Sequence, residues 1–243
     1  MPVRRGLTAG SAALLALLVA LTATVGLGPL AWLSGLACWV ALVSVVARAG
    51  PTALGPADLV TLLRAVLACA LAALVADSFL DQPVVGVLVG LAVLALLTDL
   101  VDGRVARRTG TVSPFGARFD GEVDAFLMLV LSVYVADAVH GWVLAIGLAR
   151  YVFAAAGWVL PWMRAQLPPR YWRKVVTAVQ GIVLTMATAA VLPAWLTTTT
   201  LVVALALLAE SFGRDVLWLW HRRPARLERL TGGAIGGLHL PRP

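Results

Sequence analysis

The segment Asp99-Leu100-Val101-Asp102-Gly103-Arg104-Val105-Ala106-Arg107 is followed, after eight residues, by Gly116-Ala117-Arg118-Phe119-Asp120-Gly121-Glu122-Val123-Asp124. Four aspartates at helical spacing therefore lie within an otherwise apolar chain. An ionised side chain in or near hydrocarbon costs about 3 kcal/mol or more, so four of them require a compensating partner. A divalent metal ion is the simplest such partner. The segment thus predicts a metal-dependent catalytic site.

The two halves of this segment are predicted to be helices whose acidic faces meet. Residues three, four and seven apart share a helix face. The first helix presents on one face Asp99, Asp102, Gly103, Ala106 and Arg107. The second presents Gly116, Asp120 and Asp124. Gly110 and Pro114 in the link favour a tight reversal, so the helices should run antiparallel. All four carboxylates are then expected at similar depths near the cytoplasmic end.

The composition of this site indicates the kind of ligand. Carboxylate oxygens favour Mg²⁺ or Mn²⁺, and Mg²⁺ is often shared between carboxylates and substrate phosphates. Two ions and a phosphate-containing substrate are therefore expected. The small residues Gly103, Ala106 and Gly116 would let a nucleotide or pyrophosphate approach the backbone, and Arg107 could hold a phosphate oxygen. The alternative is that the small residues serve helix packing and that the arginines are loop charges.

The composition of the whole chain is that of an integral membrane protein. Hydrophobic residues make up 61% and charged residues 13%, and the mean hydropathy is +0.93. Such values lie outside the range of soluble domains. Apolar runs long enough to cross about 30 Å of hydrocarbon predict eight membrane helices and an all-α fold. They are expected near 8–26, 29–47, 59–76, 84–103, 118–137, 142–162, 175–193 and 198–219.

The basic residues predict the orientation of these helices. Lys and Arg collect in cytoplasmic segments, and alternate turns here contain none of them. Eight helices with both termini and the acidic site in the cytoplasm satisfy every loop, and a bacterial cytoplasmic membrane is the expected location. The alternative for the first run, behind Arg4 and Arg5, is a signal peptide. The net charge of +7 is explained by loops that face anionic headgroups, so nucleic-acid binding is not expected.

The pattern Asp-x2-Asp-Gly-x2-Ala-Arg-x8-Gly-x3-Asp-x3-Asp, which Asp99 to Asp124 fills completely, resembles the signature of the CDP-alcohol phosphatidyltransferase family. A second, weaker correspondence is the run from Pro56 to Arg64, where the family often shows Pro-Asn-x-x-Thr-x-x-Arg. Here Asp58 departs from the usual Asn, and Pro56 and Asp58 also suit a helix start. The resemblance implies a six-helix catalytic core over about 56–220, after two N-terminal membrane helices in 1–55 and before a basic tail, 221–243.

The resemblance also implies an activity and the residues for it. The family transfers a phosphatidyl or other substituted phosphate group from a CDP-linked donor, usually CDP-diacylglycerol, to an alcohol and releases CMP. It implies that Asp99, Asp102 and Asp120 are the main metal ligands. Asp124 would be the general base and a further ligand. Donor contacts are expected at Gly103, Ala106, Arg107, Gly116, Thr61 and Arg64. A homodimer in contact with membrane lipids is also implied.

The acceptor alcohol is predicted from basic residues outside the acidic segment. Arg150 lies within a predicted membrane helix, where an arginine usually pairs with a carboxylate or lines a polar cavity. Arg164, Arg173 and Lys174 follow, and Lys174-Val175-Val176-Thr177 resembles a Lys-x-x-Thr element of the family. Together they could bind an anionic acceptor such as glycerol 3-phosphate or inositol phosphate. The alternative for Arg164 and Arg173 is ordinary cytoplasmic loop charge, and Glu210, Arg214 and Asp215 are expected to form a structural ion-pair cluster.

Two other classes of membrane protein also use carboxylate clusters. Intramembrane prenyltransferases also bind a diphosphate through aspartates and Mg²⁺, but their acidic motifs lie in distant loops rather than one hairpin. A cation transporter or a catalytically silent scaffold is the non-enzymatic alternative. Neither would require Gly103, Ala106, Arg107 and Gly116 beside the acids, and a transporter should bind Mg²⁺ without dependence on CDP.

Overall fold

The computed structural model describes residues 1–221 except 52, 83, 110–112, 166 and 169, and it describes only the backbone of 100 and 102–109. Over this part of the chain the fold is all-α, without a strand, as the sequence predicts. The α-helices are α1 (Val3–Val25), α2 (Pro29–Ala49), α3 (Pro56–Asp77), α4 (Val85–Thr109), α5 (Pro114–Ala138), α6 (Leu144–Val159), α7 (Tyr171–Ala189) and α8 (Ala194–His221). Two short 3₁₀ helices, η1 (Gly141–Val143) and η2 (Pro161–Arg164), flank α6.

Several helices begin earlier than the hydropathy predicts because prolines start them. Pro56 and Pro114 are the first residues of α3 and α5, three and four residues before the expected starts. Proline suits this position because its missing N–H would have no partner inside the helix. The Ser113 hydroxyl caps α5 by accepting a hydrogen bond of 2.8 Å from the Gly116 N–H. At the other end, α6 stops at Val159, just before Pro161, rather than at the expected residue 162.

Five segments of the described chain are long and apolar enough to cross a membrane, and the chain is an integral membrane protein. They are α1, α2, α3, the η1–α6 segment Gly141–Val159, and α8. Helix α4 has a shorter apolar part, Val85–Asp99. The helices outside this set are α4, α5 and α7, and they contain the predicted metal-binding aspartates and Lys174. Their membrane assignment therefore stays a prediction from the apolar runs and the positive-inside pattern.

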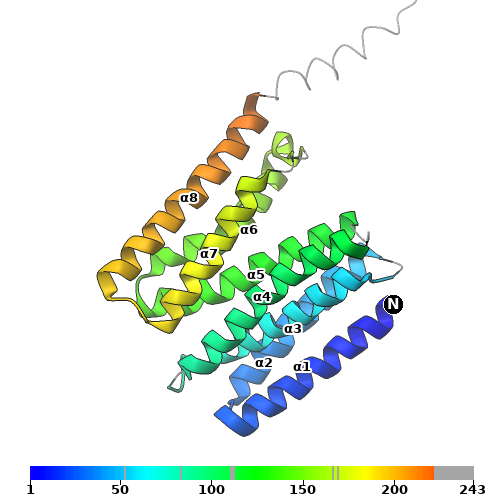
Figure 1. The fold of residues 1–243 in the computed structure, drawn as a ribbon, viewed down its shortest axis with the longest axis vertical. Coiled ribbons are helices and arrows are strands. Elements are labelled where there is room, and N and C mark those ends of the chain that lie inside the picture. The colour runs from blue at the N-terminus through cyan, green and yellow to red at the C-terminus, as the bar shows by residue number, and fades with distance from the viewer. Residues whose placement is uncertain (52, 83, 110–112, 166, 169, 222–243) are drawn as a thin grey trace, which may run out of the picture.

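Helix α3 is the centre of the bundle. In its most apolar window 72% of residues are buried inside the protein, against 17–22% in the other four spans. Helices α1, α2, α4 and α5 all pack against it, and in Figure 1 α1 and α8 lie at opposite edges of the bundle. Alanines and glycines allow the close approach: a Cβ on Gly35 of α2 would lie 3.2 Å from the Ala73 Cβ. The polar side chains of α3 are therefore held within the protein.

Helices α5 and α6 are in direct backbone contact at Gly147. A Cβ there would lie 2.6 Å from the Leu129 Cα and 2.8 Å from the Ser132 Oγ, closer than real Cβ atoms approach. We expect Gly147→Ala to destabilise the protein by about 1–3 kcal/mol because the two helices must separate. Thermal unfolding in detergent measures this effect. The matched control is Gly90→Ala in α4, where a Cβ meets nothing within 4 Å. There the change should be neutral or stabilising, and equal effects at both positions would contradict the packing argument.

Candidate active site

The acidic faces of α4 and α5 meet in the space beside α3. Each of these two helices packs against α3 and also against α7. One carboxylate oxygen from each of Asp99, Asp120 and Asp124 lies within 4.8 Å of the other two. Asp102 lies one turn after Asp99 in α4, but its side chain is outside the described residues. The structure therefore brings together the three predicted ligands whose side chains it describes.

Arg64 of α3 connects these carboxylates. Its Nη2 lies 3.2 Å from the Asp99 Oδ1, and its Nη1 donates to the Asp120 Oδ1 at 2.8 Å. Nη1 also donates to the Asp124 Oδ1. One guanidinium thus contacts acids that lie 35, 56 and 60 positions further along the chain. The sequence predicts that Arg64 contacts the CDP-linked donor. It does not reveal this network of ion pairs, because the network depends on how α3 is rotated relative to α4 and α5.

Burial differs sharply between the two sides of the cluster. The Arg64 side chain is fully buried, whereas those of Asp99, Asp120 and Asp124 are 41%, 38% and 21% exposed. The guanidinium therefore contacts the carboxylates from the protein interior, and the other side of the cluster is open to the surface.

The three carboxylates of the cluster are suited to a divalent cation. Among the side chains that the structure describes, three carboxylates offer hard, anionic oxygen atoms, and no sulfur or imidazole ligand belongs to their group. Mg²⁺ and Mn²⁺ prefer such oxygens and commonly share them with phosphate oxygens of a substrate. The spacing of the oxygens, within 4.8 Å, is compatible with common ions. The described side chains therefore fit the divalent metal that the sequence predicts.

The first turns of α3 and α5 touch each other beside the cluster. Asp58 caps α3 by accepting a hydrogen bond of 2.8 Å from the Gly55 N–H, the helix-start role expected for it. A Cβ on Gly116 would lie 2.5 Å from the Asp58 Oδ1. Gly116 is thus required for close packing of α5 on α3, an explanation that does not depend on nucleotide access. The Thr61 hydroxyl, on the buried face of α3, donates to the Ala57 carbonyl at 3.2 Å.

Arg150 of α6 lies directly against α5. Its Nη2 donates to the Glu122 Oε1 at 2.6 Å, and a Cβ on Gly121 would lie 3.3 Å from that same Nη2. The two paired side chains are 44% and 50% exposed. The sequence predicts a carboxylate partner for Arg150 but does not single out Glu122. The sequence did contain a cue for this partner, because Glu122 is the one further acid between Asp120 and Asp124.

The remaining predicted acceptor residues are distributed over two elements. The Arg164 Nε donates to the Gly157 carbonyl at 2.8 Å, so this side chain caps the end of α6. Arg173 contacts the buried carboxylate of Asp215 at 3.4 Å, and Arg170 contacts it at 3.8 Å. Lys174, by contrast, lies near enough to Asp99 to interact with it electrostatically. Of these three residues, only Lys174 lies within electrostatic range of the acidic cluster.

The expected ion-pair cluster at the end of α8 is divided between two partners. Arg214 pairs with Glu210 at 2.8 Å, one turn earlier in the same helix. Asp215 joins the arginines at the start of α7, and Glu210 also accepts a hydrogen bond of 2.8 Å from the Trp172 indole there. The charged end of α8 is therefore bonded to the start of α7 through two separate acids.

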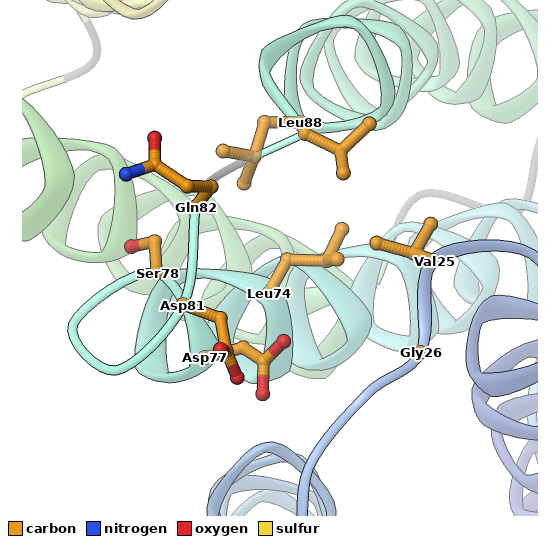
Figure 2. A pocket seen from close by; sticks show the side chains of 9 residues that line it. Val25, Gly26, Leu74, Asp77, Ser78, Asp81, Gln82 and Leu88 are labelled. Atoms are coloured by element: carbon orange, nitrogen blue, oxygen red, sulfur yellow. The ribbon is translucent and has the colours of Figure 1, made fainter.

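A separate cavity of about 250 Å³ lies at the C-terminal end of α3, and no predicted site residue lines it. Figure 2 shows Asp77, Ser78, Asp81 and Gln82 around it, together with Leu74 and Leu88. The Asp77 Oδ1 accepts a hydrogen bond of 2.9 Å from the Gly28 N–H. Asp77 therefore connects the α1–α2 turn to α3, at the end of α3 opposite to Asp58.

Comparison with known proteins agrees with the geometry. The family model for CDP-alcohol phosphatidyltransferases matches residues 54–209, which include the acidic cluster, Arg64, Arg150 and Lys174. No curated protein and no solved structure matches the chain. The match begins just before α3 and leaves α1 and α2 outside it. On this match over more than half of its length, the chain belongs to the CDP-alcohol phosphatidyltransferase family, whose members transfer a phosphate-linked group from a CDP-alcohol to an alcohol acceptor.

Proposed function

We propose that this protein transfers the phosphatidyl group of CDP-diacylglycerol to a small anionic alcohol, with release of CMP, in phospholipid biosynthesis. The observation that carries the proposal is the meeting of Asp99, Asp120 and Asp124 within 4.8 Å, beside the buried guanidinium of Arg64. A lipid donor also accounts for placing this chemistry in a membrane protein, since its acyl chains can stay in the bilayer while its headgroup reaches the cluster. The acidic side is proposed to face the cytoplasm.

The acidic residues are proposed to serve metal binding and proton transfer. Asp99, Asp120 and, on the sequence pattern, Asp102 hold two Mg²⁺ or Mn²⁺ ions. When bound, such ions stabilise negative charge on the diphosphate and the leaving CMP. Asp124 accepts the proton of the attacking hydroxyl and also contacts an ion. The alcohol oxygen forms a bond to the lipid-side phosphorus, and the bond from that phosphorus to the CMP oxygen breaks.

The donor is proposed to lie on the open side of the cluster. Gly103, Ala106 and Arg107 share the helix face of Asp99, so they are proposed to line the diphosphate and the nucleotide. Arg64 of α3, which lies behind the carboxylates, is proposed to act on the donor through them, and Thr61 is kept as a proposed donor contact. The tight contact between Gly116 and Asp58 supports a packing role for Gly116 in addition to the proposed donor contact.

The acceptor is proposed to be an alcohol that carries a phosphate, such as glycerol 3-phosphate or inositol phosphate. Two basic side chains support this choice: Lys174, which lies within electrostatic range of Asp99, and Arg150, which pairs with Glu122 and lies against α5 at Gly121. Arg164 and Arg173 are retained as further candidates, although both already bond to other groups. A homodimer is proposed from the family resemblance alone.

The decisive assay measures CMP release by the purified protein. With Mn²⁺ or Mg²⁺ and CDP-diacylglycerol, we expect CMP release that requires an acceptor and stops when EDTA removes the metal. The acceptor panel is glycerol 3-phosphate, inositol phosphate, inositol, serine and phosphatidylglycerol. Asp81→Asn is the matched control, since Asp81 lines the cavity at the far end of α3. Failure with every acceptor, together with Mn²⁺ binding that is independent of CDP, would contradict the proposal and favour a cation transporter.

A further inference from the structure

Arg64 has an arrangement that metal ligation by the aspartates does not require. We propose that it is a permanent counter-ion of the acidic cluster, which weakens the binding of divalent ions until the negatively charged donor arrives. Metal and donor binding are then coupled through this one side chain. The inference rests on the function proposed above and adds a regulatory property of the same site.

The guanidinium cannot lose its charge or leave the cluster. Arginine stays protonated in proteins. Arg64 is fully buried and contacts one Oδ1 atom of each of the three carboxylates. A buried guanidinium without these acids would be strongly unfavourable, because desolvation of a charge is costly when it has no counter-charge. The positive charge therefore stays beside the metal ligands whatever else binds there.

The ions and the guanidinium act on the same carboxylates from opposite sides. Arg64 approaches from the interior, whereas the exposed fractions of Asp99 and Asp120 place their open side at the surface. An ion on that open side is not sterically blocked by Arg64. It is repelled by the guanidinium charge a few ångströms away, and this repulsion is only partly screened because the guanidinium itself is buried.

The charges of the cluster indicate when the ions bind well. Three described carboxylates face one guanidinium. Two divalent ions would leave an excess of positive charge, and this remains true when the carboxylate of Asp102 is added. A diphosphate supplies the missing negative charge. Since coupling between two ligands is reciprocal, the donor should strengthen metal binding as much as the metal strengthens donor binding.

Titration of Mn²⁺ into the full-length protein in detergent, followed by electron paramagnetic resonance, tests the coupling. In the wild-type protein we expect CDP-diacylglycerol to tighten Mn²⁺ binding. Without donor, Arg64→Gln should bind Mn²⁺ about tenfold or more tightly than wild type, and it should lose most of the donor effect. Arg64→Lys retains the charge and should stay close to wild type. The control is Arg214→Gln, which removes an arginine paired with Glu210 outside the cluster.

Thermal unfolding gives a second readout that does not depend on activity. In EDTA, Arg64→Gln should unfold at a lower temperature than wild type because its carboxylates repel one another, and Mn²⁺ should raise its unfolding temperature more than that of wild type. Adding Asp124→Asn removes one opposing charge and should restore part of the lost stability in EDTA. If Arg64→Gln folds only with Mn²⁺, the double variant Arg64→Gln/Asp124→Asn should still fold in EDTA, so the comparison can be made. A double variant no more stable than Arg64→Gln would overturn the inference.

Two failures remain distinguishable. Absence of Mn²⁺ binding by the wild-type protein, with and without CDP-diacylglycerol, would overturn the proposed metal site and this inference together. Normal wild-type binding, with unchanged Mn²⁺ affinity and unchanged donor effect in Arg64→Gln, would overturn the inference alone.

Discussion

Asp124→Asn is expected to keep binding the donor but to lose turnover by roughly 10²- to 10⁴-fold, the usual contribution of a positioned general base. Asparagine has nearly the same shape as aspartate, and its carbonyl oxygen can still accept the hydrogen bond that Arg64 donates. It cannot take the proton of the attacking alcohol. Rates of CMP release measure the loss, and Mn²⁺-dependent binding of CDP-diacylglycerol shows whether the donor site survives.

Two comparisons make this result interpretable. Asp81→Asn, the same substitution at the far end of α3, should leave CMP release unchanged. Asp120→Asn removes another acid that Arg64 contacts and also a proposed metal ligand, so it should lose the metal-dependent donor binding that Asp124→Asn keeps. Turnover by Asp124→Asn equal to that of wild type would refute the role of Asp124 as the base.

Asp99→Asn is expected to fail at an earlier step, because it weakens the metal-dependent binding of the donor. Among the described side chains of the acidic cluster, Asp99 is the carboxylate that comes from α4, whereas Asp120 and Asp124 come from α5. Loss of its charge removes a ligand oxygen from the metal, and we expect donor affinity to fall by about 100-fold or more, since even changes around metal ligands cost about 10- to 100-fold. Equilibrium binding of CDP-diacylglycerol, with Mn²⁺ and with EDTA, measures the effect.

The two aspartate variants should therefore differ in kind. Excess Mn²⁺ should restore part of the activity of Asp99→Asn, because mass action compensates for a weakened metal site. It should restore none of the activity of Asp124→Asn. Metal-dependent donor binding by Asp99→Asn that equals wild type would show that α4 does not supply a metal ligand at this position.

The family match and the described positions of the acids agree with what the sequence alone predicts. Hydropathy and helical periodicity are local properties, so they locate the eight helices and place the aspartates of each acidic helix on one face. The helix starts were less predictable. Pro56 and Pro114 extend α3 and α5 beyond the apolar runs, because a helix begins where its first turn is capped rather than where the lipid-facing residues begin.

The partners of the charged side chains could not be obtained in this way. The pairing of Arg64 with three aspartates, of Arg150 with Glu122 and of Arg173 with Asp215 joins different helices. Such pairs depend on the rotation and depth of one helix relative to another. Those are set by close packing at Gly35, Gly116 and Gly147, where small displacements decide which atoms meet.

By itself, the sequence determined the membrane-helix architecture and the acidic pair of helices, because both are encoded in the spacing of residues along single helices. Only the tertiary structure decided that Arg64 of the central helix α3 lies behind the carboxylates, that Arg164 and Arg173 bond to groups outside the acidic cluster, and that Gly116 packs on Asp58. The physical reason is that a buried charge is stable only beside a counter-charge, and in this protein the counter-charges come from other helices.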